Sequence, residues 1–254
     1  MTTLSIIIVN YNTKKLTLDC IKSIQKFAPK FNYEIIVVDN ASLNKLTPQK
    51  FKLIQNSNNL GFSKANNQGI RMALGKYILL LNSDIVVQKG ALDALVNFAE
   101  ITPDAGVIGS RLLNPDLTIQ PSVFNFPTVT NAVVHYWFNK KILGKYAPEE
   151  NNPTQVDAVV GAAFLITPKA LKKVGLLNEK YFMYFEDIDY CRKVRSVGMK
   201  VYYLPSSEII HMHGASGGKN KYLIDASKAY HGLLNYYLIT FVIRISQIFD
   251  KITK

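Results

Sequence analysis

Short apolar runs alternate with longer amphipathic stretches along the first 110 residues. The apolar runs are typical of strands buried on both faces, and they occupy residues 4–9, 34–38, 51–54, 77–81 and 106–109. The stretches between them carry apolar residues at helical spacing, which predicts helices at residues 14–27, 63–74 and 90–101. Such alternation is typical of mostly parallel sheets with right-handed crossovers, so we expect an α/β fold.

The second half of the chain is less regular. Residues 115–153 contain five prolines and their aromatic residues follow no clean period, so only one helix-like piece is expected there, at 129–138. Regular patterns then return and end in a long apolar helix. The remaining expected elements are helices at 168–174, 186–197 and 225–249, strands at 156–166 and 200–204, and a segment 208–210 that leads into a loop with His211 and His213.

The charge of the chain is strongly basic but consists mostly of lysine. There are 30 Lys and Arg against 18 Asp and Glu, a formal net charge of +12, and only five of the basic residues are Arg. Diffuse Lys suits attraction to nucleotides or acidic lipid headgroups, although a solubilising surface explains it equally well. A nucleic-acid binder would show Arg clusters or interleaved aromatic and basic residues, so we expect no nucleic-acid partner.

Two cysteines and the opening segment bear on the compartment. Cys20 and Cys191 stand far apart within predicted helices, which fits a reducing compartment better than a disulfide framework or a zinc site. The run LSIIIVNYN is too short and too soon polar for a signal peptide, and no apolar stretch reaches the roughly 18 residues of a membrane span. We therefore expect a cytoplasmic location and no membrane-spanning helix.

Polar residues follow three of the predicted strands. Asn10-Tyr11-Asn12 follows the first, Asp39 follows the second, and Asn82-Ser83-Asp84 follows the fourth. In open α/β sheets, ligands bind beyond these carboxyl ends of the strands. The chain has neither the glycine-rich dinucleotide fingerprint nor a P-loop, which argues against hydride transfer and P-loop hydrolysis. An Asp in such a position is also common as a turn or cap residue, so both interpretations stay open for Asp39 and Asp84.

Three acids open the predicted helix at 186–197, directly after the aromatic and Met cluster at 181–185. Compensation of the helix dipole explains one or two of Glu186, Asp187 and Asp189. Packing against aromatic residues would raise a carboxyl pKa toward that of a general base. Asp84 and His211 offer ligands for Mg²⁺ or Mn²⁺, and such a cation would neutralise a leaving diphosphate.

Seven segments, taken together in their order and spacing, resemble glycosyltransferase family 2 and within it the bacterial rhamnosyltransferase-like branch. The resemblance covers about residues 4–218. It implies a GT-A fold and an inverting transfer of sugar from a nucleoside-diphosphate sugar to a glycan or lipid-linked acceptor in cell-surface polysaccharide synthesis, with a divalent cation. The segments are SIIIVNYN, EIIVVDNAS, NLGFSKANNQGI, YILLLNSDIVV, VVGAAFLI, FMYFEDIDYCRKVRSVGMKVYYLP and HMHGAS.

The resemblance implies roles for individual residues. Asp187 matches the catalytic base of the family's E-D motif, and the acceptor side is implied to contain Gly161, Ala162 and Glu186. Asp84 matches the metal-binding acid of the D-x-D motif, in which Asn82 replaces the first Asp and leaves the cation one charge poorer. His211 matches a histidine that helps hold the cation in some members, with His213 as the alternative ligand.

The donor side is implied in the same way. Asp39 matches the acid that hydrogen-bonds the pyrimidine ring of a UDP- or dTDP-linked donor, with Val9 and Tyr11 near the base. Asn67 matches a residue that lines the donor pocket. The implied donor-binding residues are Val9, Tyr11, Asp39, Asn67, Asn82 and Ser83.

We expect a single catalytic domain at 1–224, with a nucleotide-sugar half at about 1–110 and an acceptor half at about 111–224. Apolar residues nearly encircle the final helix at 225–254, so it is expected either to lie on the inner face of the plasma membrane or to pack on a second subunit. The net charge favours the membrane. Two other functions stay open, a non-catalytic membrane-associated scaffold and a nucleotidyltransferase, although NYNTKK lacks the glycines expected of the latter.

Overall fold

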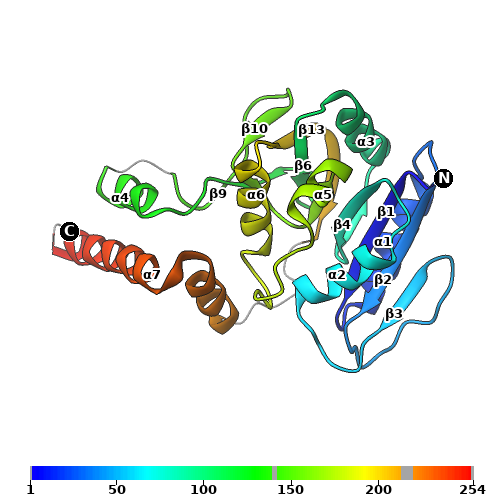
Figure 1. Cartoon of the computed structure of the whole chain (residues 1–254), viewed down its shortest axis with the longest axis horizontal. Helices are drawn as coiled ribbons and strands as arrows, with labels where there is room; N and C mark the ends of the chain where they lie inside the picture. The colour runs from blue at the N-terminus through cyan, green and yellow to red at the C-terminus, as the bar shows by residue number, and fades with distance from the viewer. Residues whose placement is uncertain (1, 139–141, 213–219, 253–254) are drawn as a thin grey trace.

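A ten-stranded sheet forms the centre of the computed structural model, which describes residues 2–138, 142–212 and 220–252. The strand order is β10-β13-β6-β12-β4-β1-β2-β3, with β5 paired to β13 and β7 paired to β6 (Figure 1). The strands of this sheet are β1 (Leu4–Asn10), β2 (Tyr33–Asp39), β3 (Lys52–Gln55), β4 (Tyr77–Asn82), β5 (Ile85–Val87), β6 (Ala105–Leu113), β7 (Ile119–Gln120), β10 (Thr154–Val156), β12 (Ala163–Ile166) and β13 (Lys200–His211).

The sheet is mostly parallel, and this confirms the α/β expectation. β1 pairs in parallel with β2 and β4, β2 with β3, and β13 with β6. β12 lies between β4 and β6 and runs antiparallel to both, an arrangement that the alternation of strands and helices did not predict. A small second sheet contains β11 (Ala158–Val159), β8 (Val123–Phe124) and β9 (Lys145–Tyr146), in that order.

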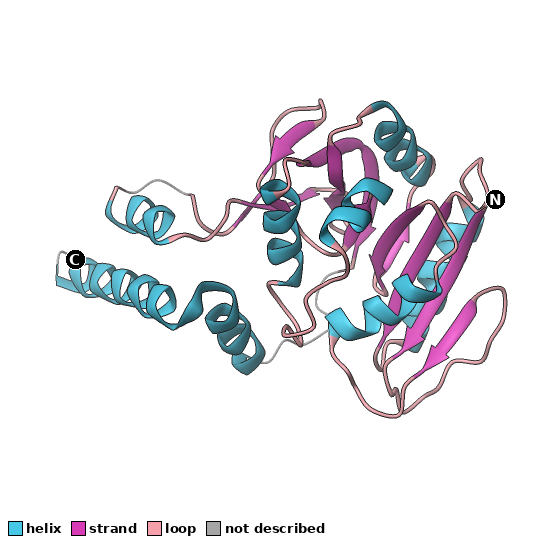
Figure 2. Cartoon of the chain, viewed as in Figure 1, coloured by secondary structure: helices cyan, strands magenta, loops and turns pink. Residues whose placement is uncertain are grey.

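Helices cover both faces of the sheet (Figure 2). Residues of α1 and α3 share one hydrophobic cluster, and residues of α2, α5 and α6 share the other. Successive residues of β1 alternate between the clusters, with Ile6 and Ile8 in the first and Ile7 in the second. Burial on both faces explains why this strand is apolar at consecutive positions. The helices are α1 (Lys14–Lys26), α2 (Phe62–Met72), α3 (Ala91–Ile101), α5 (Pro168–Val174) and α6 (Glu186–Ser196).

Helices α4 (Val129–Trp137) and α7 (Asn220–Ile252) pack on each other and project away from the sheet (Figure 1). The backbone of α7 is non-helical at Gly232, where φ is 72° and ψ is 160°, so two helices meet there at a kink. Before the kink, Ala226 and Tyr230 are buried in the hydrophobic cluster that contains α6. The expected boundary at 225 therefore falls inside a segment that packs on the catalytic unit. No helix in the described part of the chain is long and apolar enough to cross a bilayer.

Two expected elements differ from the structure. The single strand expected at 156–166 is wrong, because the chain forms β11, turns at Gly161 and Ala162, and only then enters β12. Before the turn, Val160 N–H bonds to the carbonyl of Ser122, next to β8 of the small sheet, at 2.9 Å. The strand expected at 200–204 instead continues to His211 as β13, with a register irregularity between Leu204 and Glu208.

Candidate active site

The carboxyl ends of β1, β2 and β4 are joined by side-chain hydrogen bonds, as their polar residues led us to expect. The Asn10 amide donates to Asp39 Oδ1 at 3.3 Å and to Ser42 Oγ at 2.9 Å. Thr13 Oγ1 donates to Asn10 Oδ1 at 3.0 Å and lies 2.9 Å from Ser83 Oγ. Thr13 and Ser42 therefore link the strand ends, and sequence reasoning had singled out neither.

Asp39 is buried and its carboxylate shapes the loop that follows β2. Oδ1 accepts from the Ser42 backbone N–H at 3.0 Å, and Oδ2 accepts from the Leu46 N–H at 3.4 Å. These contacts are those of a turn residue. Tyr11 is exposed nearby in the chain and Val9 is half-buried, and the base-binding roles of all three stay predictions.

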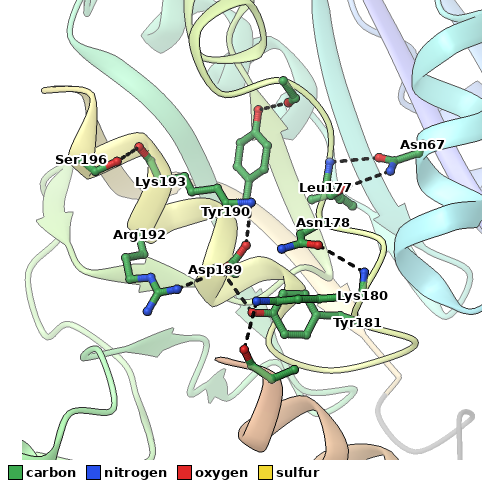
Figure 3. Close-up of polar contacts among 12 residues, drawn as sticks. Asn67, Leu177, Asn178, Lys180, Tyr181, Asp189, Tyr190, Arg192, Lys193 and Ser196 are labelled. Atoms are coloured by element: carbon green, nitrogen blue, oxygen red, sulfur yellow. Dashed lines mark hydrogen bonds and ion pairs between the residues drawn. The ribbon is translucent and has the colours of Figure 1, made fainter. Parts of the chain in front are cut away.

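Asn67 on α2 has no exposed surface, and both ends of its amide contact the loop between α5 and α6 (Figure 3). Its Nδ2 donates to the Leu177 carbonyl and to Glu179 Oε1, each at 2.9 Å, and its Oδ1 accepts from the Leu177 N–H at 3.0 Å. The amide thus ties α2 to the loop that leads to the predicted base. Its role in the donor pocket stays a prediction.

Asp84 and His211 are brought together although they lie far apart in the sequence. Pairing of β13 with β5 places His211 opposite Ile85, and His211 Nε2 lies 3.3 Å from Asp84 Oδ1. Both side chains are buried. Gln120 Oε1 lies 2.7 Å from the other ring nitrogen of His211. The alternative ligand His213 lies outside the described residues.

The pair has the chemistry of a partial site for a divalent cation. A carboxylate oxygen and an imidazole nitrogen about 3 Å apart can both reach one octahedral ion with bonds of about 2.1 Å. Within the residues that the structure describes, no cluster of three or more His, Cys, Asp or Glu side chains could hold a metal. Mg²⁺ commonly takes one or two protein ligands and completes its shell with water and substrate phosphates. Asp84 and His211 therefore fit such a cation.

Asp187 stands in the first turn of α6 and its carboxylate is held by two backbone groups. Oδ2 accepts from the Gly161 N–H at 3.0 Å and Oδ1 accepts from the Ile188 N–H at 2.8 Å. Burial raises the pKa of Asp187 above its ordinary value, and these hydrogen bonds and the charge of Lys145 act in the opposite direction. The turn at Gly161 and Ala162 thus lies beside the predicted base, and its expected role on the acceptor side stays a prediction. Lys145 is a further charged neighbour that sequence reasoning missed.

Glu186 is almost completely buried and only partly satisfied. Its Oε2 has no hydrogen-bond partner among the described residues. Burial raises the pKa of Glu186 well above its ordinary value, and the neighbouring charge of Asp187 raises it further. A buried oxygen of this kind is available to a polar ligand, which is compatible with the expected acceptor role.

Asp189, the third acid of the motif, has a structural environment (Figure 3). Its carboxylate lies 3.1 Å from Arg192 and 2.9 Å from Lys193, and it accepts from the Tyr181 hydroxyl at 3.2 Å. Its side chain is buried among these partners. The ion pairs occupy Asp189, so the role of base falls to its neighbours.

The loop that precedes these acids is strained and held from two sides. Tyr184 and Phe185 have positive φ values of 73° and 68°, which are costly for residues with side chains. On one side, Phe62 N–H bonds to the Phe182 carbonyl at 2.6 Å. On the other, Tyr222 of α7 stacks on Phe182, with ring centroids 4.6 Å apart, and Tyr230 packs on Phe185 at 5.1 Å. Helices α2 and α7 thus fix the approach to Glu186 and Asp187.

The sequence matches the model of Glycosyl transferase family 2 over residues 5–171, which is well over half of the chain. The chain belongs to glycosyltransferase family 2. The match covers the strand ends with Asp39 and Asp84 and the turn at Gly161. Asp187 and His211 lie beyond it, and the structure brings each of them to those elements.

Several relatives of this glycosyltransferase are named as rhamnosyltransferases, the branch that the motifs resemble. The N-acetylglucosaminyl-diphospho-decaprenol L-rhamnosyltransferase of Mycobacterium tuberculosis is 27% identical over 212 residues, covering 73% of this chain and 68% of the relative. Rhamnosyltransferase WbbL of Escherichia coli is 27% identical over 194 residues, covering 71% of this chain and 73% of the relative.

Solved structures share the fold of this glycosyltransferase. Staphylococcus aureus TarS 1–349 superposes with a TM-score of 0.61 at 16% identity, covering 91% of this chain and 64% of that one. GalNAc-T7, solved with UDP, GalNAc and Mn²⁺, superposes with a TM-score of 0.65 at 17% identity, covering 89% and 47%. The chain thus spans about half to two thirds of the length of these structures. The expected GT-A fold is confirmed.

Proposed function

We propose that this glycosyltransferase moves a sugar, with inversion, from a UDP- or dTDP-linked donor to a glycan or lipid-linked acceptor in cell-surface polysaccharide synthesis. The observation that carries the proposal is a backbone hydrogen bond of 2.9 Å from Asn82 N–H to the Ala162 carbonyl. It joins the strand end that leads to Asp84 with the turn whose Gly161 N–H holds Asp187. A carboxylate base and the candidate cation ligands are thereby fixed relative to each other, as an in-line displacement needs.

The chemistry follows from these positions. Asp187 accepts the proton of the acceptor hydroxyl as its oxygen forms a bond to the anomeric carbon of the donor sugar. The bond from that carbon to the phosphate oxygen breaks, and its electron pair leaves with the nucleoside diphosphate. Asp84 and His211 would hold Mg²⁺ or Mn²⁺, which supplies positive charge next to the leaving diphosphate. No covalent intermediate is required, because one displacement inverts the configuration.

The relatives support the choice of substrates. The mycobacterial relative is named for a diphospho-decaprenol acceptor, and a Shigella flexneri relative, 22% identical over 216 residues, is named as a dTDP-rhamnosyl transferase. A dTDP-linked rhamnose donor and a lipid diphosphate acceptor are therefore the first pair to test.

We also propose that the enzyme is cytoplasmic and lies on the inner face of the plasma membrane through α7. Beyond the kink at Gly232, most exposed side chains of α7 are apolar, and we call this surface the apolar face of α7. A bilayer covers such a face, and the net charge of +12 favours an anionic leaflet. A second copy of the chain is the competing occupant. The residues of the face are Leu233, Leu234, Tyr237, Leu238, Phe241 and Ile248.

A panel of UDP- and dTDP-linked sugars with Mg²⁺ or Mn²⁺ tests the activity, with release of nucleoside diphosphate as the readout and a polyprenyl-diphosphate sugar as acceptor. We expect one donor to support turnover, and we expect excess chelator or Asp84→Asn to stop it and to weaken nucleoside diphosphate binding. Full activity in excess chelator would remove the cation from the mechanism. Absence of turnover with every donor and acceptor would favour the non-catalytic scaffold.

A further inference from the structure

A chain of hydrogen bonds runs from the hairpin between β6 and β7 to His211. Asp116 Oδ1 accepts from Thr118 Oγ1 at 2.6 Å, and Thr118 Oγ1 accepts from the Asn114 amide at 2.9 Å. Asn114 Oδ1 accepts from Gln120 Nε2 at 2.9 Å, and Gln120 Oε1 lies 2.7 Å from His211 Nδ1. These four polar side chains of the hairpin therefore form a continuous series of contacts, and the last contact is made to the candidate cation ligand.

In this series of hydrogen bonds, Asp116 at the exposed end determines which partner donates and which accepts in each bond. The bonds from Thr118 hold the pKa of the Asp116 carboxyl below its ordinary value, so this carboxylate can only accept. Thr118 donates its hydroxyl proton to Asp116 and must therefore accept a hydrogen bond from the amide nitrogen of Asn114. The amide oxygen of Asn114 is then directed toward Gln120 and accepts a hydrogen bond from its amide nitrogen. The oxygen of Gln120 faces His211, and Nδ1 of His211 must be the donor.

Proton placement on Nδ1 has a consequence for the opposite side of the ring. With Nδ1 committed to Gln120, Nε2 is the ring nitrogen that faces the carboxylate of Asp84 or a cation, and a lone pair on that nitrogen is what ligates metals. Nε2 of His211 is the atom that lies 3.3 Å from Asp84 Oδ1. Gln120 is only 5% exposed and is fixed by its pairing with Leu112 in β6. It is therefore placed rigidly enough to orient the ring.

We propose that Gln120 is a positioning residue that keeps a proton on Nδ1 of His211 and fixes the orientation of the ring, so that Nε2 faces Asp84. The use of Nε2 for a cation rests on the proposed function, whereas the proton on Nδ1 does not. The competing explanation is that Gln120 stabilises only the hairpin and that His211 contacts it without consequence.

The experiment compares the full-length protein with Gln120→Leu, which removes the acceptor, and Gln120→Glu, which keeps one. The matched control is Gln68→Leu, because Gln68 also loses two side-chain hydrogen bonds, both to Asn56 and away from His211. The ring ¹⁵N signals of His211 are recorded without metal, because they report separately whether Nδ1 and Nε2 carry a proton. Binding of Mn²⁺, with and without UDP, is then measured for the same four proteins.

We expect the wild type, Gln120→Glu and Gln68→Leu to carry a proton on Nδ1 of His211, and Gln120→Leu to lose this preference. We expect Gln120→Leu to bind Mn²⁺ about 10–100-fold more weakly, the usual effect of losing a ligand's hydrogen-bond partner, and Gln120→Glu to restore affinity. A wild-type Nδ1 without a proton, or an unchanged Nδ1 proton in Gln120→Leu, would overturn the proposal. If no protein binds Mn²⁺, the cation of the proposed function fails, and the Nδ1 proton of the metal-free protein still decides the role of Gln120.

Discussion

Two adjacent carboxyl groups at the start of α6 differ in how the protein satisfies them. The carboxylate of Asp187 receives two backbone N–H groups, whereas Oε2 of Glu186 receives none from the described residues. Hydrogen bonds from the backbone fix the orientation of Asp187, and they favour its charged form against the effect of burial. This difference separates the two roles, since a base must be oriented and ionised, while an unsatisfied oxygen is suited to contact a substrate.

Replacement of the base tests this assignment. Asp187→Asn should lower the rate of transfer by about 10²–10⁴-fold, the usual contribution of a general base, while binding of the nucleoside diphosphate changes little. Because burial raises the pKa of Asp187 above the ordinary 3.8, the rate for the wild type should fall on the acid side at a pH above that value. Steady-state kinetics across pH and calorimetry with the nucleotide provide the measurements. Near-normal turnover by the variant would transfer the role of base to Glu186.

Glu186 gives a prediction about stability. Its pKa is raised in the folded protein by burial and by the charge of Asp187, so its contribution to stability is lost as pH rises from about 4.5, the ordinary value, through the folded-state pKa. Glu186→Gln has no carboxyl group to ionise, so its stability does not fall in this way as pH rises. The variant should therefore gain stability relative to the wild type across that interval and keep a constant advantage above it. Urea unfolding at several pH values measures the trend.

Glu179→Gln serves as the control for this trend, because the pKa of Glu179 is shifted in the opposite direction from that of Glu186. Hydrogen bonds from Asn67 and Arg71 lower the pKa of Glu179 in the folded protein, so the wild-type group stabilises above its ordinary pKa and loses that effect as pH falls. The Glu179 variant should thus be the less stable one at neutral pH and should approach the wild type in acid. Parallel trends for the two variants would contradict the environments described for both carboxyl groups.

At the scale of elements, Gly61 at the start of α2 decides how closely the loop before α6 approaches. Its φ is 82°, and a Cβ there would overlap the carbonyl oxygen and the ring of Phe182. Gly90 has nearly the same φ of 80°, but a Cβ there would meet nothing within 4 Å. Gly90 is therefore a control for a glycine of positive φ that makes no such contact, while the ψ of Gly61 (177°) adds a backbone restriction of its own.

Gly61→Ala and Gly90→Ala should accordingly differ. Gly90→Ala should cost about 1–2 kcal/mol for its left-handed backbone, whereas Gly61, with ψ of 177°, lies in a region that is nearly restricted to glycine. Gly61→Ala should cost more than Gly90→Ala and should also lower the rate of transfer, because the displaced Phe182 precedes Asp187. Urea unfolding and kinetics on both variants provide the measurements. Equal effects on stability and rate would mean that the approach of Phe182 has no bearing on the base.

The sequence predicted most elements of the first half because each βα unit carries its own periodicity. It failed at residues 156–166, where the apolar run continues through a turn whose contacts, Gly161 with Asp187 and Val160 with Ser122, are distant in the sequence. Short strands such as β5 and β7 are set by their partners in the sheet, so no local pattern marks them.

Site residues that belong to a sequence motif could be predicted. Site residues whose part depends on contacts between distant segments could not. The sequence pointed to Asp84, Asp187 and His211, and the structure brings Asp84 to His211 and Asp187 to Gly161. Nothing in the sequence marked Gln120, because its part depends on a hairpin that folds against the end of β13. The hydrogen bonds that both ends of the Asn67 amide make could not be predicted either, since their partners lie about 110 positions away in the sequence.

At the scale of the whole molecule, the arm formed by α4 and α7 is divided by the kink at Gly232. Before the kink, Tyr230 packs on Phe185 and lies under the guanidinium of Arg192, at 4.1 Å from the ring centroid. Beyond it lies the apolar face of α7. The first part supports the loop that leads to the proposed base, and the second part carries the face that we propose to lie on the membrane.

Two truncations separate these parts. A chain ending at Gly232 should keep donor binding and transfer to a soluble acceptor, yet should no longer sediment with anionic liposomes. A chain ending at Ala229 loses Tyr230 from the core as well, so its unfolding midpoint and its rate should both fall. Sedimentation with anionic and neutral liposomes, thermal unfolding and kinetics are the measurements.

Point variants give the control for the membrane proposal. Leu234 and Phe241 are 75% and 61% exposed, so replacing both with Glu should spare the fold while abolishing liposome binding. Ile101→Glu changes an 80% exposed residue on α3 and should leave liposome binding intact. If the full-length protein ignores liposomes and the Leu234 and Phe241 variant instead turns dimers into monomers, the face belongs to a second subunit.

The reversed strand β12 also determines when the sheet can be completed. Leu81 of β4 pairs with Ala163, roughly eighty positions later, and pairing over such separations is slow because a long loop must close first. On the ribosome, β1 to β4 emerge while one edge of β4 still lacks its neighbour, and an apolar edge of that kind recruits other chains. Aggregation during overexpression should therefore follow the delay between synthesis of β4 and of β12, and slower translation between them should worsen it even though the finished enzyme is unchanged.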